Sequence, residues 1–257
     1  MTWNIGLALL LTAAAGLSTG IGSVIAYFIR KPKMVYLSFS LGFSAGVMIY
    51  ISFMELLPQA LARKGEVWGI TAFFIGIIFI GLIDWSIPQA KNPHHFKEPS
   101  NIVGASQNES LMRTGLLTAL AVGIHNFPEG LATFGAVLGD VRLGAIIAVA
   151  IAIHNIPEGI SVSVPIFYAT GNRNKALTYS LLSGLSEPVG AVIGFLILRP
   201  FLSPGLLAAL MAFIAGIMVY ISIDELLPLA HRYGHGHTVI LGIILGMLIM
   251  ALSLLLL

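Results

Sequence analysis

The motif His-Asn-x-Pro-Glu-Gly occurs twice in this sequence, beginning at His125 and again at His154. In each copy the Glu follows the His at position i+4, so on an α-helix both side chains project from one face, about one turn (5.4 Å) apart. Imidazole nitrogen, carboxylate and amide oxygen together suit Zn²⁺, Fe²⁺, Mn²⁺ or Co²⁺. The predicted metal ligands are His125, Asn126, Glu129, His154, Asn155 and Glu158.

Prolines and a further acidic residue extend this donor set. Pro128 and Pro157 each remove a helical hydrogen bond, which leaves the carbonyl groups of Ile124 and Ile153 without their usual donors. Glu187, which precedes a proline, is expected at the same depth on a third helix. The donors exceed what one tetrahedral ion needs, so two neighbouring metal sites that share carboxylates are consistent with the sequence.

The structural alternative is that each His–Glu pair is a buried hydrogen bond between helices. However, the apolar runs that hold the two motifs and Glu187 contain no Lys or Arg at this level. Several carboxylates at one depth without a basic partner leave uncompensated negative charge unless a cation binds. We therefore favour the metal site.

The composition shows which solvent surrounds these residues. Of 257 residues, 57% are hydrophobic and only 9% are charged, whereas soluble proteins carry about a quarter charged residues. The net charge of +2 is spread over loops and provides no basic face for nucleic acid. The absence of cysteine excludes disulfides, thiolate metal sites and cysteine nucleophiles. The sequence is that of an integral membrane protein.

Eight apolar runs reach the length needed to span a bilayer as helices, which predicts an all-α fold. They are approximately Ile5–Ile29, Tyr36–Leu57, Val67–Ile87, Gly115–Leu138, Gly144–Tyr168, Ala176–Leu198, Gly205–Leu227 and Thr238–Leu257. His125 and His154 each lie about ten residues into a run, or about 15 Å deep at about 1.5 Å per residue, near the centre of a core about 30 Å thick.

The basic residues predict the orientation of the spans. With both termini outside, most Lys and Arg residues of the loops fall on the inner side, as the positive-inside rule requires. The inner set is Arg30, Lys31, Lys33, Lys91, Lys97, Arg113, Arg173, Lys175 and Arg232, and the outer set is Arg63, Lys64, Arg142 and Arg199.

The chain reads as one transmembrane domain, residues 1–257. The first three helices fall in 1–87, a cytoplasmic loop in 88–112, the two motif-bearing helices in 113–168 and the last three in 176–257. The loop contains His94 and His95, whose spacing does not require a metal.

An internal repeat relates the two ends of the chain. The segment from Met48 through Glu55 to Pro58 matches the segment from Met218 through Glu225 to Pro228. The shift equals five spans, an odd number, so the copies have opposite orientations in the membrane. Together with the doubled motif, this predicts an inverted repeat of three, two and three helices, an arrangement frequent in secondary transporters.

Acidic and histidine residues near the span ends predict an entrance and an exit. Glu55 is expected near the outer end of the second span, and its repeat partner Glu225, with Asp224, near the inner end of the seventh. His231, followed by His235 and His237, could receive a metal ion on the inner side. The alternative is that they are ordinary residues of the membrane interface and of a solvated loop. Asp84 is expected at the inner interface.

The whole chain resembles the ZIP (Zrt-, Irt-like protein) family of divalent-metal transporters, in its bacterial branch. The resemblance rests on the eight spans, the doubled His-Asn-x-Pro-Glu-Gly motif and Ser186-Glu187-Pro188. It implies that the seven predicted ligands hold one or two transported ions at the membrane midplane. It also implies import of Zn²⁺, and of Fe²⁺, Mn²⁺, Co²⁺ or Cd²⁺, across the bacterial inner membrane, with no prosthetic group.

The main alternative is an intramembrane metal-dependent hydrolase, which would also place His and carboxylates at depth. The His-Glu-x-x-His signature of metalloproteases does not occur in the sequence. The expected partners are divalent metal ions and the lipid bilayer, with no nucleic acid. The sequence does not determine the oligomeric state, and a homodimer is one arrangement that it allows.

Overall fold

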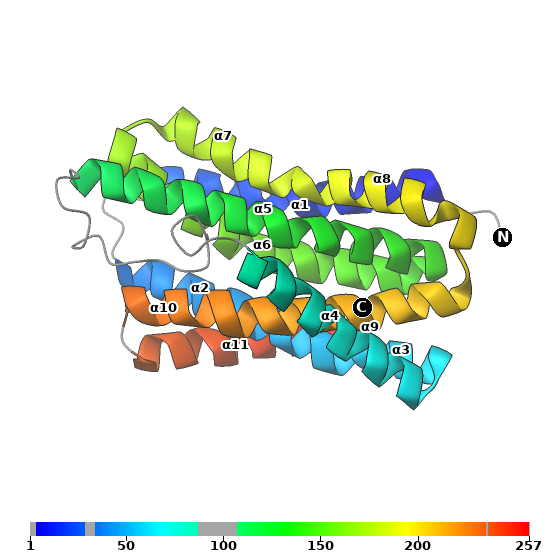
Figure 1. The fold of residues 1–257 in the computed structure, drawn as a ribbon. Helices are drawn as coiled ribbons and strands as arrows, with labels where there is room; N and C mark the ends of the chain where they lie inside the picture. The colour runs from blue at the N-terminus through cyan, green and yellow to red at the C-terminus, as the bar shows by residue number, and fades with distance from the viewer. Residues whose placement is uncertain (1–3, 29–33, 87–106, 235, 257) are drawn as a thin grey trace.

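The computed structural model describes residues 4–28, 34–86, 107–234 and 236–256, and helix is the regular structure found in them (Figure 1). The elements are α1 (Ile5–Phe28), α2 (Met34–Ile51), η1 (Ser52–Leu56), α3 (Leu57–Lys64), α4 (Glu66–Ser86), α5 (Gln107–Gly139), α6 (Val141–Thr170), α7 (Arg173–Gly184), α8 (Ser186–Leu198), η3 (Arg199–Phe201), α9 (Pro204–Ile221), η4 (Ser222–Leu226), α10 (Leu227–Tyr233) and α11 (Gly236–Leu256).

Seven helical stretches in the described residues are long and apolar enough to cross a membrane. Helix α5, with 33 residues, also has the length to cross a membrane. Large apolar side chains cover the outside of the molecule, among them Trp68, Leu82 and Leu196. Because such side chains would be unfavourable in water, the protein is a multi-pass membrane protein.

The helices form two layers (Figure 1). One layer contains α1, α5, α6 and the broken helix α7–α8, and the other contains α2, α4, α9, α10 and α11. In the first layer α6 packs extensively on α1 and α5, and α8 packs on α5. In the second layer the main pairs are α2 with α11 and α4 with α9. The two motif helices, α5 and α6, are therefore direct neighbours.

Glycines permit the closest helix crossings. A Cβ atom at Gly159 of α6 would collide with the carbonyl oxygen of Thr19 in α1, and one at Gly190 of α8 would collide with that of Phe127 in α5. Such small residues let helix backbones approach closely in membranes. These crossings fix the depth of the motif helices relative to α1 and α8.

Two π-helical segments extend the second and seventh spans beyond their expected ends. The predicted spans end at Leu57 and Leu227, but the helices continue past Pro58 and Pro228 to Lys64 and Tyr233. In η1 the Leu57 N–H donates to the Ser52 carbonyl, and in η4 the Leu227 N–H donates to the Ser222 carbonyl. The wider turn accommodates each proline within the continuing helix.

Other boundaries also differ from the expected ones. Helix α5 begins at Gln107, so the end of the predicted loop 88–112 is helical. The predicted sixth span, Ala176–Leu198, instead begins at Arg173 and is interrupted at Leu185. His94 and His95 lie outside the described residues.

Candidate metal centre

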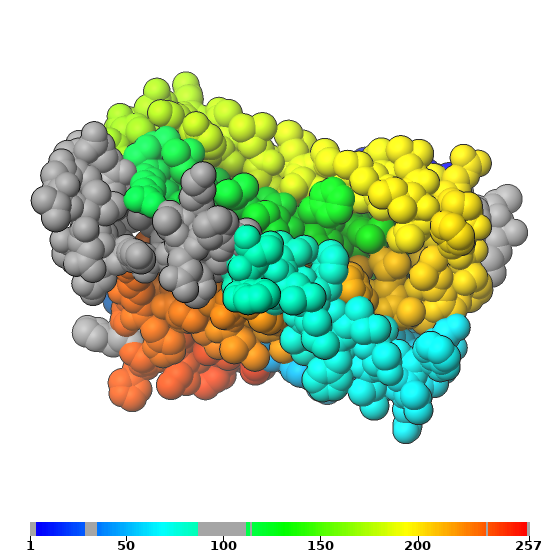
Figure 2. Space-filling model, viewed as in Figure 1, coloured from blue at the N-terminus to red at the C-terminus, as the bar shows by residue number. Residues whose placement is uncertain are grey.

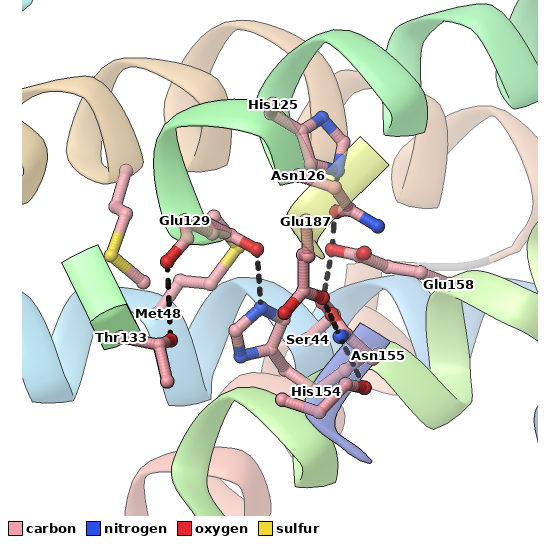
Figure 3. A network of polar contacts seen from close by, with 12 residues as sticks. Ser44, Met48, His125, Asn126, Glu129, Thr133, His154, Asn155, Glu158 and Glu187 are labelled. Atoms are coloured by element: carbon pink, nitrogen blue, oxygen red, sulfur yellow. Dashed lines mark hydrogen bonds and ion pairs between the residues drawn. The ribbon is translucent and has the colours of Figure 1, made fainter. Parts of the chain in front are cut away.

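All seven predicted ligands lie in the interior of the protein and face one another (Figure 3). They come from α5, α6 and the first turn of α8, and each side chain is at most 1% exposed. Helices α5 and α6 remain continuous through Pro128 and Pro157. The interruption at Leu185 makes Glu187 part of the amino-terminal turn of α8.

The histidines and glutamates of the two motifs pair between helices. His154 Nε2 lies 3.2 Å from Glu129 Oε2, and His125 Nε2 lies 3.4 Å from Glu158 Oε1. Each imidazole of one motif thus meets the carboxylate of the other. The i, i+4 spacing puts the His and the Glu of each motif on one face of their helix. The close crossing of α5 and α6 turns these two faces toward each other.

The asparagines connect the motifs to neighbouring helices. Asn155 Nδ2 donates to Glu187 Oε1 and also, at 2.9 Å, to the Ala15 carbonyl of α1. Asn126 Nδ2 lies 3.4 Å from the Ser183 carbonyl of α7. With the amide nitrogens engaged in this way, the amide oxygens of both asparagines remain available as ligands.

Every predicted ligand keeps at least one buried nitrogen or oxygen atom without a hydrogen-bond partner. These atoms are both ring nitrogens of His125, His154 Nδ1, Asn126 Oδ1, Asn155 Oδ1, Glu129 Oε1, Glu158 Oε2 and Glu187 Oε2. Buried polar atoms are nearly always satisfied in proteins, so such a concentration at one place requires an explanation. All of them are atoms that bind divalent transition metals.

The charges favour a cation. Glu129, Glu158 and Glu187 are completely buried, and the ion pairs of Glu129 and Glu158 are with imidazole rings. Buried carboxylates without a strong basic partner are very unfavourable in a membrane interior. A divalent cation would compensate their charge directly.

The described residues contain no group of three or more His, Asp and Glu side chains already arranged to hold an ion. The Nε2 atoms of His125 and His154 are instead directed at carboxylate oxygens. An entering ion must therefore separate these pairs and take the place of the contacts between them.

Two residues beyond the predicted ligands also contact the centre. Ser44 of α2 is fully buried, and its Oγ donates to Glu158 Oε1 at 3.2 Å. Glu225 of η4 is 4% exposed and places Oε2 3.6 Å from His125 Nδ1. No sequence signal indicated Ser44. Glu225 was expected near the inner exit, and the structure places it beside the central cluster.

The remaining entrance and exit residues lie apart from this cluster. Glu55 is half-buried and accepts a hydrogen bond from Gln59 at 3.4 Å. Asp224 is half-buried, whereas His231 is exposed. His235 lies outside the described residues. Asp84, expected at the interface, is buried and accepts a hydrogen bond from the Tyr220 hydroxyl at 3.4 Å.

Comparisons with known proteins agree with this chemistry. Residues 88–254 match the family described as ZIP Zinc transporter. The chain is 53% identical to a zinc transporter ZupT of Akkermansia muciniphila, with 95% of each chain covered. It is also 53% identical to the ZupT proteins of Streptococcus mutans and Lysinibacillus sphaericus, over 100% of this chain and at least 99% of theirs. The chain therefore belongs to the ZIP family of zinc transporters.

Proposed function

We propose that this protein imports Zn²⁺ into the cytoplasm through the centre formed by α5, α6 and α8. The observation that carries the proposal is the set of seven buried side chains with unpartnered donor atoms at the crossing of the motif helices. The zinc transporters with which the chain shares its full length support it. Fe²⁺, Mn²⁺, Co²⁺ and Cd²⁺ share the ligand preferences of this centre and are proposed as further substrates.

The centre is proposed to hold two ions. His125, His154 and the carboxylates between them supply one group of donors. Asn155 and Glu187, which are in contact, supply a second group (Figure 3). A carboxylate has two oxygens and can bridge neighbouring ions, which makes Glu158 the proposed shared ligand.

The proposed architecture is the inverted repeat of three, two and three helices, with eight spans. Two observations support it. Pairing of α1 with α6 corresponds under the repeat to pairing of α8 with α5, and α2 with α11 corresponds to α9 with α4. In addition, η1 and η4 occupy equivalent positions in the two copies. Exchange of the two copies between equivalent conformations would give alternating access.

The proposed location is the bacterial inner membrane, with both termini outside. The excess of basic residues in the predicted inner loops supports this orientation. It places Glu55 toward the outside and Asp224 and His231 toward the cytoplasm. Glu225 would then stand between the centre and the inner exit, since it already contacts His125.

Uptake of ⁶⁵Zn²⁺ by proteoliposomes tests the proposal. Vesicles that contain the protein should accumulate the isotope above protein-free vesicles, and unlabelled Mn²⁺, Fe²⁺, Co²⁺ or Cd²⁺ should compete. A metal-dependent hydrolase would not move the ion, and the relatives compared above are transporters. Equal accumulation in both kinds of vesicle would contradict the proposal.

A further inference from the structure

An apolar cavity of about 490 Å³ lies between the two layers, outside the metal centre. Its walls come from α4, α5 and α9, and include Phe79, Ile83, Ile124, Phe127, Phe213 and Ile217. On the face shown in Figure 2, the carboxyl-terminal half of α4 lies beside α5. The volume is within the range of about 300–1,000 Å³ typical of ligand pockets.

The lining excludes water and ions as occupants. All lining side chains are apolar or, at Gly123, absent, so a water molecule would find none of the two to four polar partners that it needs. The occupant must therefore be apolar.

The position of the cavity identifies the class of occupant. Phe213 and Ile217 lie well inside the span formed by α9 and α10, and Phe127 lies well inside α5. Phe79 on the cavity wall is 45% exposed, which gives the cavity contact with the surroundings of the protein. At this depth a multi-pass membrane protein is surrounded by hydrocarbon chains.

We propose that this cavity binds one acyl chain of a membrane phospholipid. The acyl chain enters between α4 and α5 and packs against the rings of Phe79 and Phe213, whose centroids are 5.3 Å apart. The lipid is retained by the cavity, unlike the freely exchanging lipid on exposed side chains such as Phe74. This inference does not depend on which ion the centre transports.

The bound acyl chain would contact the metal-binding motif of α5 from the side of the cavity. Ile124, Phe127, Pro128 and Leu131 form a stripe with i, i+3, i+4 and i+7 spacing on α5, and this stripe lines the cavity. His125 lies on the same turn of α5 and faces the metal centre (Figure 3). The acyl chain therefore supports the motif helix against α4 and α9, so lipid and metal sites share one helical turn.

Photocrosslinking tests the proposal on the full chain. The protein is reconstituted in phosphatidylglycerol vesicles that contain a phospholipid with a diazirine in its acyl chain, and the labelled residues are mapped by mass spectrometry. Labelling at Phe79, Phe127 and Phe213 should survive delipidation in detergent before irradiation, whereas labelling at Phe74 should not. Equal loss of labelling at both sets would overturn the proposal.

Filling the cavity provides the second test. Ile217→Trp places an indole inside it, and Ile80→Phe is a milder replacement on the facing wall. Either folded variant should lose most of the phospholipid that co-purifies with the wild type, as measured by native mass spectrometry. Leu241→Trp, on the exposed face of α11, is the matched control and should retain it. Unchanged lipid content in both cavity variants would contradict the assignment.

Discussion

Ser44 belongs to the second layer and contacts the metal centre through an uncharged hydroxyl group. Its hydroxyl holds Glu158 Oε1, and Glu158 Oε2 remains available for an ion. Ser44→Ala should weaken Zn²⁺ binding by about tenfold, because groups that orient a metal ligand typically contribute this much to affinity. Isothermal titration of the purified protein measures the change. Ser86→Ala, at an exposed serine of α4, should bind Zn²⁺ like the wild type.

Glu187 distinguishes a centre with two ions from one with a single ion. Its Oε2 is buried and unpartnered, and its Oε1 is held by Asn155. Crystals soaked in Zn²⁺ should show an anomalous peak about 2.0–2.2 Å from a Glu187 oxygen. A carboxylate that lies far from every anomalous peak would exclude Glu187 from the ligands.

Acid should weaken metal binding at this centre. A histidine ligand must be neutral and a glutamate ligand must be ionised, so protons compete with the ion for His125, His154, Glu129 and Glu158. The dissociation constant for Zn²⁺ should therefore rise as the pH is lowered from about 7.5 to about 5.5, through the range in which histidine titrates. Zn²⁺ titrations at fixed ionic strength measure this directly. Affinity independent of pH would show that the histidines are not ligands.

At the scale of the elements, close helix crossings hold the motif helices in register. A Cβ at Gly159 would collide with the Thr19 carbonyl, which is backbone and cannot move aside easily. Gly159→Ala should destabilise the protein by about 1–3 kcal/mol, the usual effect of overpacking, and lower its unfolding temperature in detergent. Gly6→Ala is the matched control, because no atom lies within 4 Å of a Cβ there. Equal unfolding temperatures for the two variants would refute this role of the crossing.

The elements also show what the sequence could and could not predict. Hydropathy and spacing located the spans and placed His125 and Glu129 on one helical face, because both signals are local. The spans were expected to end at Leu57 and Leu227, but a π turn accommodates the proline that follows each of them within a longer helix. The interruption at Leu185 did carry a local signal, because proline breaks a helix interior but is tolerated in a first turn, and Pro188 lies in the first turn of α8.

The sequence could not predict which distant segments of the protein contact each other. The crosswise pairing of His125 with Glu158 depends on the angle at which α5 and α6 cross. Ser44 and Glu225 reach the centre only because α2 and η4 of the second layer pack against the first. Six of the seven predicted ligands stand in a repeated motif, which is the signal from which the sequence could propose them, whereas Ser44 and Glu225 belong to no metal-ligand motif.

At the scale of the whole molecule, the two layers meet at the metal centre. Ser44 and Glu225 belong to the second layer and contact Glu158 and His125 of the first. An ion held at the proposed centre would lie where the layers touch, and relative movement of the layers would change its access to either side of the membrane. A membrane-spanning carrier needs its substrate site at such a junction.

The central claim is that zinc crosses the membrane through this centre. The direct measurement is ⁶⁵Zn²⁺ uptake by proteoliposomes that contain wild type, Glu129→Ala or Glu66→Ala, with equal amounts of folded, inserted protein. Glu129 is completely buried beside His154, whereas Glu66 is exposed at the start of α4. The predicted result is uptake by the wild type and by Glu66→Ala, with uptake by Glu129→Ala reduced to the level of protein-free vesicles. Normal uptake by Glu129→Ala would contradict the account.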